Sequence, residues 1–142
     1  MVVNSIFTLS EVDSIISGRA LSNDVVARLG HLSVSRRLIP YIQLHEFEAL
    51  LFSDPSAFLE AFPGNQTAVE RLTAIRAQFQ DPEEIDEAPG KGPSKRILEV
   101  LPDYQKPVAG LLVAQRIGLA AIRRQCRHFD DWLTRIFAAA HT

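Results

Sequence analysis

The run from Arg37 to Pro55 constrains the fold most, because an apolar segment changes directly into a helical pattern within it. Leu38–Gln43 is too short for a helix and rich in β-favouring residues, so we interpret it as a strand. Pro40 cannot donate to a ladder, so this strand begins near it or lies at a sheet edge. From His45 to Phe52 the apolar spacing becomes helical. Ligands of open α/β sheets collect beyond the carboxyl ends of strands, so the polar residues at this junction indicate a site.

The composition fits a single domain that needs no covalent support. The chain has 142 residues, and its 46% hydrophobic content is enough to form a core. The net charge is -2, so no overall positive field attracts nucleic acid or acidic lipid. The single cysteine, Cys126, excludes an internal disulfide and a multi-cysteine zinc site, and it fits a reducing cytosol.

Export and membrane signals are not recognisable in the sequence. The longest apolar stretches, such as Ala109–Ala114, fall far short of the ~20 residues that cross a bilayer. The first residues lack a positive n-region and carry acids early, unlike a secretory signal. We therefore expect a soluble, cytoplasmic protein without a membrane partner.

Capping signals divide the rest of the chain into short helices. Ser53 and Asp54 cap a helix with Pro55 at its first position, and Thr67 with Glu70 forms the capping-box pattern of another. The segment Asp81–Ser94 is acidic and then rich in Gly and Pro, so we predict an exposed loop. The other predicted helices are Glu11–Ser17, Val25–Leu29, Lys95–Leu101, Pro107–Ile117, Leu119–Cys126 and Asp130–Ala140, the last with an aromatic stripe that we expect to be buried.

The first candidate site consists of His45 and Glu48, three residues apart on the predicted helix. This spacing lets an imidazole nitrogen and a carboxylate oxygen reach one metal ion or one proton-transfer partner, whereas Glu46 points elsewhere. The zinc-protease pattern is excluded, because position 49 is Ala. Spacing alone favours the structural alternative, in which these groups cap the helix start, where the dipole favours carboxylates.

The second candidate is the start of the next helix, where Ser94 is followed by Lys95 and Arg96. Cations in the first turn oppose the helix dipole unless an anion is near, and backbone N–H groups there form a natural phosphate site. The glycine spacing excludes a Walker loop. The alternative, which we favour slightly, is an internal salt bridge to the acidic stretch Glu83–Glu87.

A third, cationic group lies on the late helices. It would suit phosphate contacts if it faced outward on one side, but such groups are more often solvated faces. The neighbouring Asp130 and Asp131 can cancel much of its field. Cys126 has only His128 nearby as a further ligand, so we interpret it as a core cysteine. The cationic group consists of Arg116, Arg123, Arg124 and Arg127.

Three ordered segments resemble a known family. They are PYIQLHEFEALLFSDP, PSKRI and IGLAAIRRQCRHFDDWL, and the likeness covers about residues 37–137. Together they resemble the bacterial family catalogued as domain of unknown function 4276. That family is similar to TOPRIM-type and RloB-like proteins, whose members often lie beside ATPases in systems suspected of phage defence.

The resemblance implies a metal site of which this chain carries only a part. TOPRIM-type sites use a glutamate after an early strand and paired aspartates after a later one to hold Mg²⁺. Residues 1–36 carry neither pattern, while Glu48 matches the glutamate of the family's HEFEALLF segment and His45 and Glu46 match its neighbours. The chain therefore resembles the C-terminal portion of a longer member, and a second chain would have to supply further Mg²⁺ ligands.

We expect an α/β fold that is mostly helical, an incomplete TOPRIM-like unit of one to three strands with an appended layer of short helices. Residues 1–36 are expected to be a divergent N-terminal segment and residues 37–142 a family-like domain. The resemblance implies a metal-dependent, nuclease-like protein that processes nucleic acid in a phage-defence-type system with an ATPase. Its candidate residues are Glu48, His45 and Glu46 for catalysis, Glu48 and His45 for the metal, and Lys95, Arg96 and Ser94 for phosphate.

The alternative is a non-catalytic interaction or assembly module, a truncated family member without independent activity. Such a module would bind a partner ATPase or a second copy of itself as a homo-oligomer. An unpaired strand edge would favour this pairing.

Overall fold

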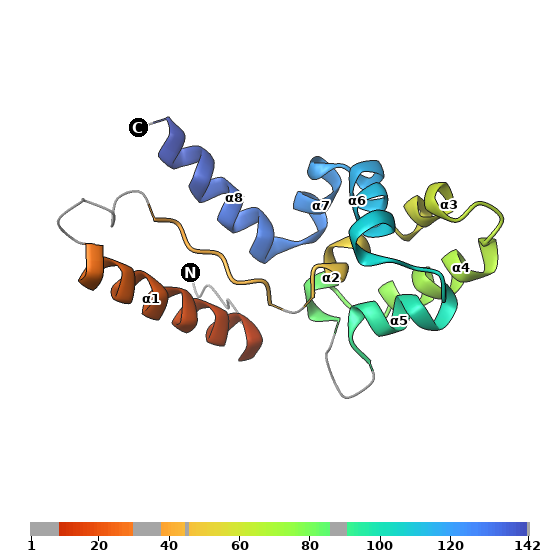
Figure 1. The fold of residues 1–142 in the computed structure, drawn as a ribbon, viewed down its shortest axis with the longest axis horizontal. Coiled ribbons are helices and arrows are strands. Elements are labelled where there is room, and N and C mark those ends of the chain that lie inside the picture. The colour runs from red at the N-terminus through yellow and green to blue at the C-terminus, as the bar shows by residue number, and fades with distance from the viewer. Residues whose placement is uncertain (1–8, 30–37, 45, 86–90, 142) are drawn as a thin grey trace, which may run out of the picture. The chain divides into compact units, whose positions relative to one another are not determined.

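The computed structural model describes residues 9–29, 38–44, 46–85 and 91–141 (Figure 1). The chain divides into two compact units. The central unit comprises His45–Asp130, and the terminal unit combines Met1–Leu44 with Asp131–Thr142. The described residues are mostly helical, as predicted. The domain boundary predicted at residue 36 stays a prediction, because residues 30–37 lie outside the described part.

Short helices build the central unit. Too short to be stable alone, they depend on packing against one another. Asp54 caps the first 3₁₀ turn as predicted, accepting a hydrogen bond of 3.0 Å from the backbone N–H of Ser56. The elements are α2 (Glu48–Leu51), η3 (Pro55–Ala57), α3 (Phe58–Ala61), α4 (Gln66–Arg76), η4 (Pro82–Glu84), α5 (Pro93–Val100), the π-helix η5 (Lys106–Gly110), α6 (Leu111–Ile117), α7 (Leu119–Gln125) and the start of α8 (Arg127–Ala140).

One hydrophobic cluster forms the core of this unit, and α2 lies inside it. All four residues of α2 are buried. This helix begins at Glu48, so it is shorter than the helix predicted from His45. Each of the helices α3, α4, α5, α6 and α7 also contributes at least one buried apolar side chain. Fully buried members of the cluster include Leu51, Phe52, Phe58, Leu72, Ile85, Ile97 and Val113.

The terminal unit contains α1 (Leu9–Leu29), residues 38–44 and the remainder of α8. The two short helices predicted in the N-terminal region are parts of the single helix α1. Among the described residues no helix is both long and apolar enough to cross a membrane, even though α1 has 21 residues.

The strand predicted over Leu38–Gln43 was wrong, since the described residues contain no β-strand. This segment contacts the Trp132 side chain instead of a neighbouring strand. The Trp132 indole N–H donates to the carbonyl of Ile39 at 3.2 Å, and its ring stacks on Tyr41 with centroids 4.6 Å apart. Pro40 has no N–H to give to a ladder. A short apolar run of this kind is compatible with a strand or with part of a buried helix, so its pattern alone does not determine the structure that it adopts.

The aromatic stripe of α8 was also predicted wrongly, because no residue of this helix is buried. Trp132, Leu133 and Ile136 are half-buried. Phe137 remains 44% exposed. The periodic spacing identified the helix correctly, but its apolar side chains are only partly covered.

Gly118 provides a direct test of the junction between α6 and α7. Its φ of 78° and ψ of 151° lie in a region that is essentially restricted to glycine. We expect Gly118→Ala to lower the free energy of unfolding by about 1–3 kcal/mol, measured by chemical denaturation.

Gly18→Ala is the matched control for this substitution. Gly18 lies inside α1, where an added Cβ would meet only the Pro40 ring, at an ordinary 3.9 Å. Alanine should therefore stabilise the helix by about 0.5–1 kcal/mol. Equal effects of the two substitutions would contradict the assigned backbone at Gly118.

Candidate functional site

Two segments singled out in the sequence meet in the central unit. The backbone N–H of Ser94, at the start of α5, donates to Oε2 of Glu46 at 2.8 Å. The approach is close, because a Cβ added at Gly92 would lie 3.6 Å from Oε1 of Glu46. His45, the remaining candidate of this segment, lies outside the described residues.

Glu46 acts as an anion at the N-terminus of α5. Burial opposes ionisation of its carboxyl, but hydrogen bonds from Ser94 and the charges of Lys106 and Lys95 outweigh this, so the pKa of Glu46 is lowered. The helix dipole favours a negative charge at this place. The anion that the cations of α5 require is thus a carboxylate of the same chain.

Glu48 is held by two other donors. Its side chain is only 1% exposed, and Oε2 lies 3.2 Å from Nζ of Lys106. The Tyr104 hydroxyl donates to Oε1 over 3.4 Å. Burial and the neighbouring Glu48 raise the pKa of Tyr104, so this hydroxyl keeps its proton. Both oxygens of Glu48 therefore face donors that belong to the protein.

The predicted phosphate-binding residues have different surroundings. Ser94 is buried, and its N–H is taken by Glu46. Arg96 lies over the Phe79 ring, 5.7 Å from its centroid, and its Nε donates to the Lys91 carbonyl at 2.5 Å. Lys95 is exposed. Of the two cations, Lys95 is the more exposed to solvent.

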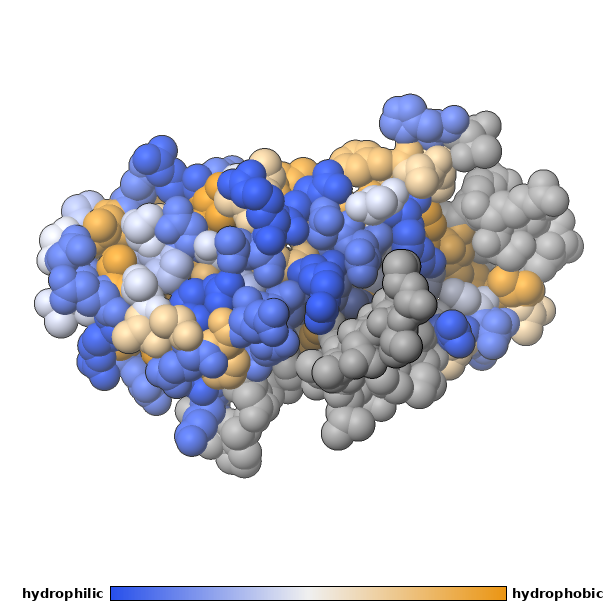
Figure 2. Space-filling model, turned by 180° about the vertical axis from the view of Figure 1, so that it is seen from behind, coloured by the Kyte–Doolittle hydropathy of each residue, from blue (hydrophilic) through white to orange (hydrophobic). Residues whose placement is uncertain are grey.

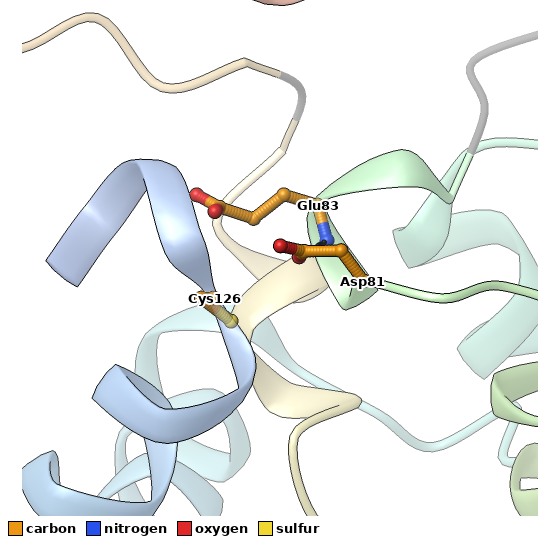
Figure 3. A group of neighbouring side chains, drawn as sticks. All are labelled: Asp81, Glu83 and Cys126. Atoms are coloured by element: carbon orange, nitrogen blue, oxygen red, sulfur yellow. Dashed lines mark hydrogen bonds between the residues drawn. The ribbon is translucent and has the colours of Figure 1, made fainter. Parts of the chain in front are cut away.

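A second group was missed from the sequence. The ligand atoms of Asp81, Glu83 and Cys126 all lie within 4.8 Å of one another. Figure 3 shows the two carboxylates extending from the η4 turn toward the segment that carries Cys126. The expected exposed loop over residues 81–94 was wrong at both ends. Asp81, Pro82 and Glu83 are buried at its start, and Gly92, Pro93 and Ser94 are buried at its end, the last two within α5. The order Asp-Pro-Glu-Glu, which forms a capping box here, was the available signal.

The two carboxylates of this group bind the N-terminus of α8. Asp81 accepts from the backbone N–H of Arg127 at 3.1 Å and from that of Glu83 at 2.8 Å. Glu83 accepts from the backbone N–H of His128 at 2.8 Å. Burial raises the pKa of Asp81 despite these bonds. The arrangement satisfies the first N–H groups of a helix, which have no partner inside it.

The side chains of this group already have partners within the chain. Burial raises the pKa of the Cys126 thiol to about 12, and its Sγ lies 3.2 Å from the Ser53 hydroxyl. The carboxylates already accept backbone hydrogen bonds. The group is thus a helix cap beside a core cysteine, which agrees with the interpretation of Cys126 from the sequence.

Two of the four arginines of the late helices pair with acids of the same chain. Arg116 pairs with Glu60 at 3.0 Å, and Arg123 pairs with Asp130. Arg124 is exposed. The pairing of Arg123 with Asp130 is one that the sequence indicated.

Comparison with known proteins identifies the family. The family described as "Domain of unknown function (DUF4276)" matches residues 16–136, which is most of the chain. The chain therefore belongs to the domain of unknown function 4276 family. No curated protein and no solved structure matches it. The family match begins inside the segment that the sequence suggested to be divergent.

The Glu48–Lys106 pair predicts an asymmetry between two substitutions. Lys106→Met leaves a buried carboxylate without its cation, so we expect a loss of about 3 kcal/mol or more in the free energy of unfolding. Glu48→Gln keeps an acceptor for Tyr104 and leaves a lysine whose side chain is 56% exposed and can be hydrated, so it should cost less. Urea denaturation measures both. A larger loss for Glu48→Gln would contradict the pairing.

Glu46 predicts a dependence of stability on pH. Because the folded protein lowers the pKa of this carboxyl below its usual 4.5, Glu46 stabilises the fold above that pH and loses the effect as the pH falls through the lowered value. Glu46→Gln should cost about 1 kcal/mol at neutral pH, as for other caps. The difference from the wild type should disappear in acid. A difference that persists in acid would show that Glu46 acts through packing alone.

Proposed function

We propose that this chain works as a non-catalytic interaction module that binds a protein through one apolar face. The observation that carries the proposal is the exposure of three neighbouring side chains. Val108 is 60% exposed, Leu111 55% and Leu112 51%. Val108 lies in η5, and Leu111 and Leu112 are the first two residues of α6. Val113 and Ile117, on the opposite side of α6, are buried in the core.

Phe47 is also exposed, but it lies beside the buried Gly110 rather than beside these three side chains. Its ring lies next to η5, since a Cβ added at Gly110 would come within 3.5 Å of Cε1, and 45% of the residue is exposed. On the face drawn in Figure 2, apolar residues appear as separate patches among polar ones. Single exposed apolar residues are normal, whereas contiguous ones mark interaction sites. Val108, Leu111 and Leu112 are called the apolar face below.

The second candidate function is the metal-dependent processing of nucleic acid, in a phage-defence-type system with an ATPase, that the resemblance implies. It would use Glu48 with His45 and Glu46 to hold Mg²⁺, and Lys95 with Arg96 and Ser94 to hold phosphate. Magnesium requires several oxygen ligands in octahedral geometry. The donors already bound to Glu46 and Glu48 favour the interaction module over this candidate.

Stability measurements test whether the apolar face is kept for a partner. Leu111→Ala and Leu112→Ala should each change the free energy of unfolding by less than about 0.5 kcal/mol at submicromolar concentration, as at other surface sites. Ile117→Ala, on the same helix, is the matched control, and it should cost about 2–5 kcal/mol.

Two results would contradict the proposal. Losses at Leu111 and Leu112 as large as that at Ile117 would place these residues in the chain's own core. Mg²⁺-dependent cleavage of DNA or RNA that is lost in Glu48→Gln would favour the second candidate.

A further inference from the structure

We infer that Lys106 is a modification site, where N-acylation by an acyl phosphate releases the π-helix η5 from α2. The inference goes beyond the proposed function, because it concerns how η5 is held and not what binds beside it. Acylation of a lysine removes the positive charge of its side chain. The consequence depends on what that charge does in the fold, and here it neutralises Glu48, the least exposed acid in the described part of the chain.

Glu48 holds η5 at both ends. Nζ of Lys106, the first residue of η5, lies 3.2 Å from Oε2 of Glu48. At the last residue of η5, a Cβ added at Gly110 would come within 2.8 Å of the Tyr104 hydroxyl, which donates to Oε1 of Glu48. This hydrogen bond measures 3.4 Å, well beyond the usual ~2.7–2.8 Å between two oxygens. The ion pair is therefore the stronger of the two connections.

Lys106 combines this role with access from solvent. Its side chain is 56% exposed, whereas the carboxylate that it contacts is buried. A small reagent can thus reach the amine without opening the core. Although burial opposes ionisation of Glu46, hydrogen bonds from Ser94 and the charge of Lys106 lower its pKa, so a second acid depends on the same cation.

The residue type at position 106 favours a charge that can be removed. The chain has 15 lysines and arginines together, of which only Lys91, Lys95 and Lys106 are lysines. Arginine is the usual cation of buried ion pairs and is always charged, whereas lysine can be acylated. The exposed pairs with Asp24 and Glu60 use arginine. The pair that neutralises the buried Glu48 is therefore one that acylation can break.

The reaction balances with an acyl phosphate as the donor. The uncharged amine of Lys106 attacks the acyl carbon, so that a C–N bond forms and the C–O bond to phosphate breaks. Phosphate leaves with the bonding electrons, and the proton of the amine passes to solvent. The product is a neutral amide, and Glu48 keeps only the long hydrogen bond from Tyr104. A buried carboxylate without its cation is strongly destabilising, and release of η5 lets water reach it.

The test measures amide hydrogen exchange by NMR in the full chain with acetyllysine in place of Lys106. The N–H of Ala109, which donates to the Gln105 carbonyl at 2.8 Å, reports on η5. Its exchange should become about tenfold faster or more, while the amides of α4 stay protected relative to the unfolded chain. Lys106→Arg keeps the charge and should keep the slow exchange of Ala109.

Two matched controls and one reaction complete the experiment. Acetyllysine in place of Lys91, an exposed lysine outside η5, should leave the exchange of Ala109 unchanged. In Glu48→Gln no buried charge requires a cation, so acetyllysine at position 106 should then accelerate exchange less than about twofold. Acetyl phosphate added to the wild type should acetylate Lys106, as read by peptide mass spectrometry.

Several results would overturn the inference. Unchanged exchange of Ala109 with acetyllysine would show that the charge does not hold η5. Fast exchange in Lys106→Arg, or an acceleration that persists in Glu48→Gln, would assign the effect to side-chain shape. Loss of protection in α4 together with Ala109 would mean that the whole unit unfolds, and a Lys106 that resists acetyl phosphate would exclude the modification. These results leave the test of the apolar face untouched.

Discussion

The ion pair between Glu48 and Lys106 is the interaction on which the central unit most depends. A carboxylate that is 1% exposed is costly unless donors surround it. Lys106 and Tyr104 supply these donors from a single segment, about sixty residues further along the chain. Glu48 thereby connects α2, at the centre of the core, to the π-helix that leads into α6. The same π-helix carries Val108 of the apolar face, so η5 contributes both the cation that pairs with Glu48 and part of the exposed apolar surface.

Acidic side chains at the starts of helices recur in this fold. Asp54 caps η3, Glu46 binds the N-terminus of α5, and Asp81 with Glu83 binds that of α8. Helix starts present unpaired N–H groups and a partial positive charge, and a fold of many short helices has many of them. Much of the acidity that suggested chemistry in the sequence is used to satisfy this requirement.

Local signals predicted the parts of the fold that depend on neighbouring residues. The cap at Asp54 and the core position of Cys126 follow from such patterns. A helix was also predicted near Thr67, but its capping box was wrong, because α4 begins at Gln66 after Asn65 and has no side-chain cap. Contacts across the chain were less accessible, because nothing near Glu46 indicates that Ser94, 48 residues later, donates to it. The same holds for Glu48 and Lys106. The segment over Leu38–Gln43 was misjudged because a short apolar run does not specify its partners, and here the partner is Trp132.

Two polar segments that the sequence marked as separate candidates meet in the structure, through the hydrogen bond from Ser94 to Glu46. Glu46 and Glu48, which looked available for a metal, contact donors of the same chain, whereas the side chain of Lys95 is exposed. The structural alternative, in which these groups cap the start of their own helix, was also wrong: α2 has no side-chain cap, Glu46 binds the N-terminus of α5, and Glu48 contacts Lys106 and Tyr104. The exposed leucines drew no attention in the sequence, since a leucine in a helix is expected to be buried.

Paramagnetic Mn²⁺ added to the isotopically labelled protein tests most directly whether Glu46 and Glu48 support the fold or bind a metal. Bound Mn²⁺ broadens the amide signals of nearby residues. The account predicts that signals from Glu46 to Leu51 lose no more intensity than those of the exposed acids Glu99 and Asp103. A selective loss between Glu46 and Leu51 would show that these carboxylates bind a divalent cation and would contradict the account.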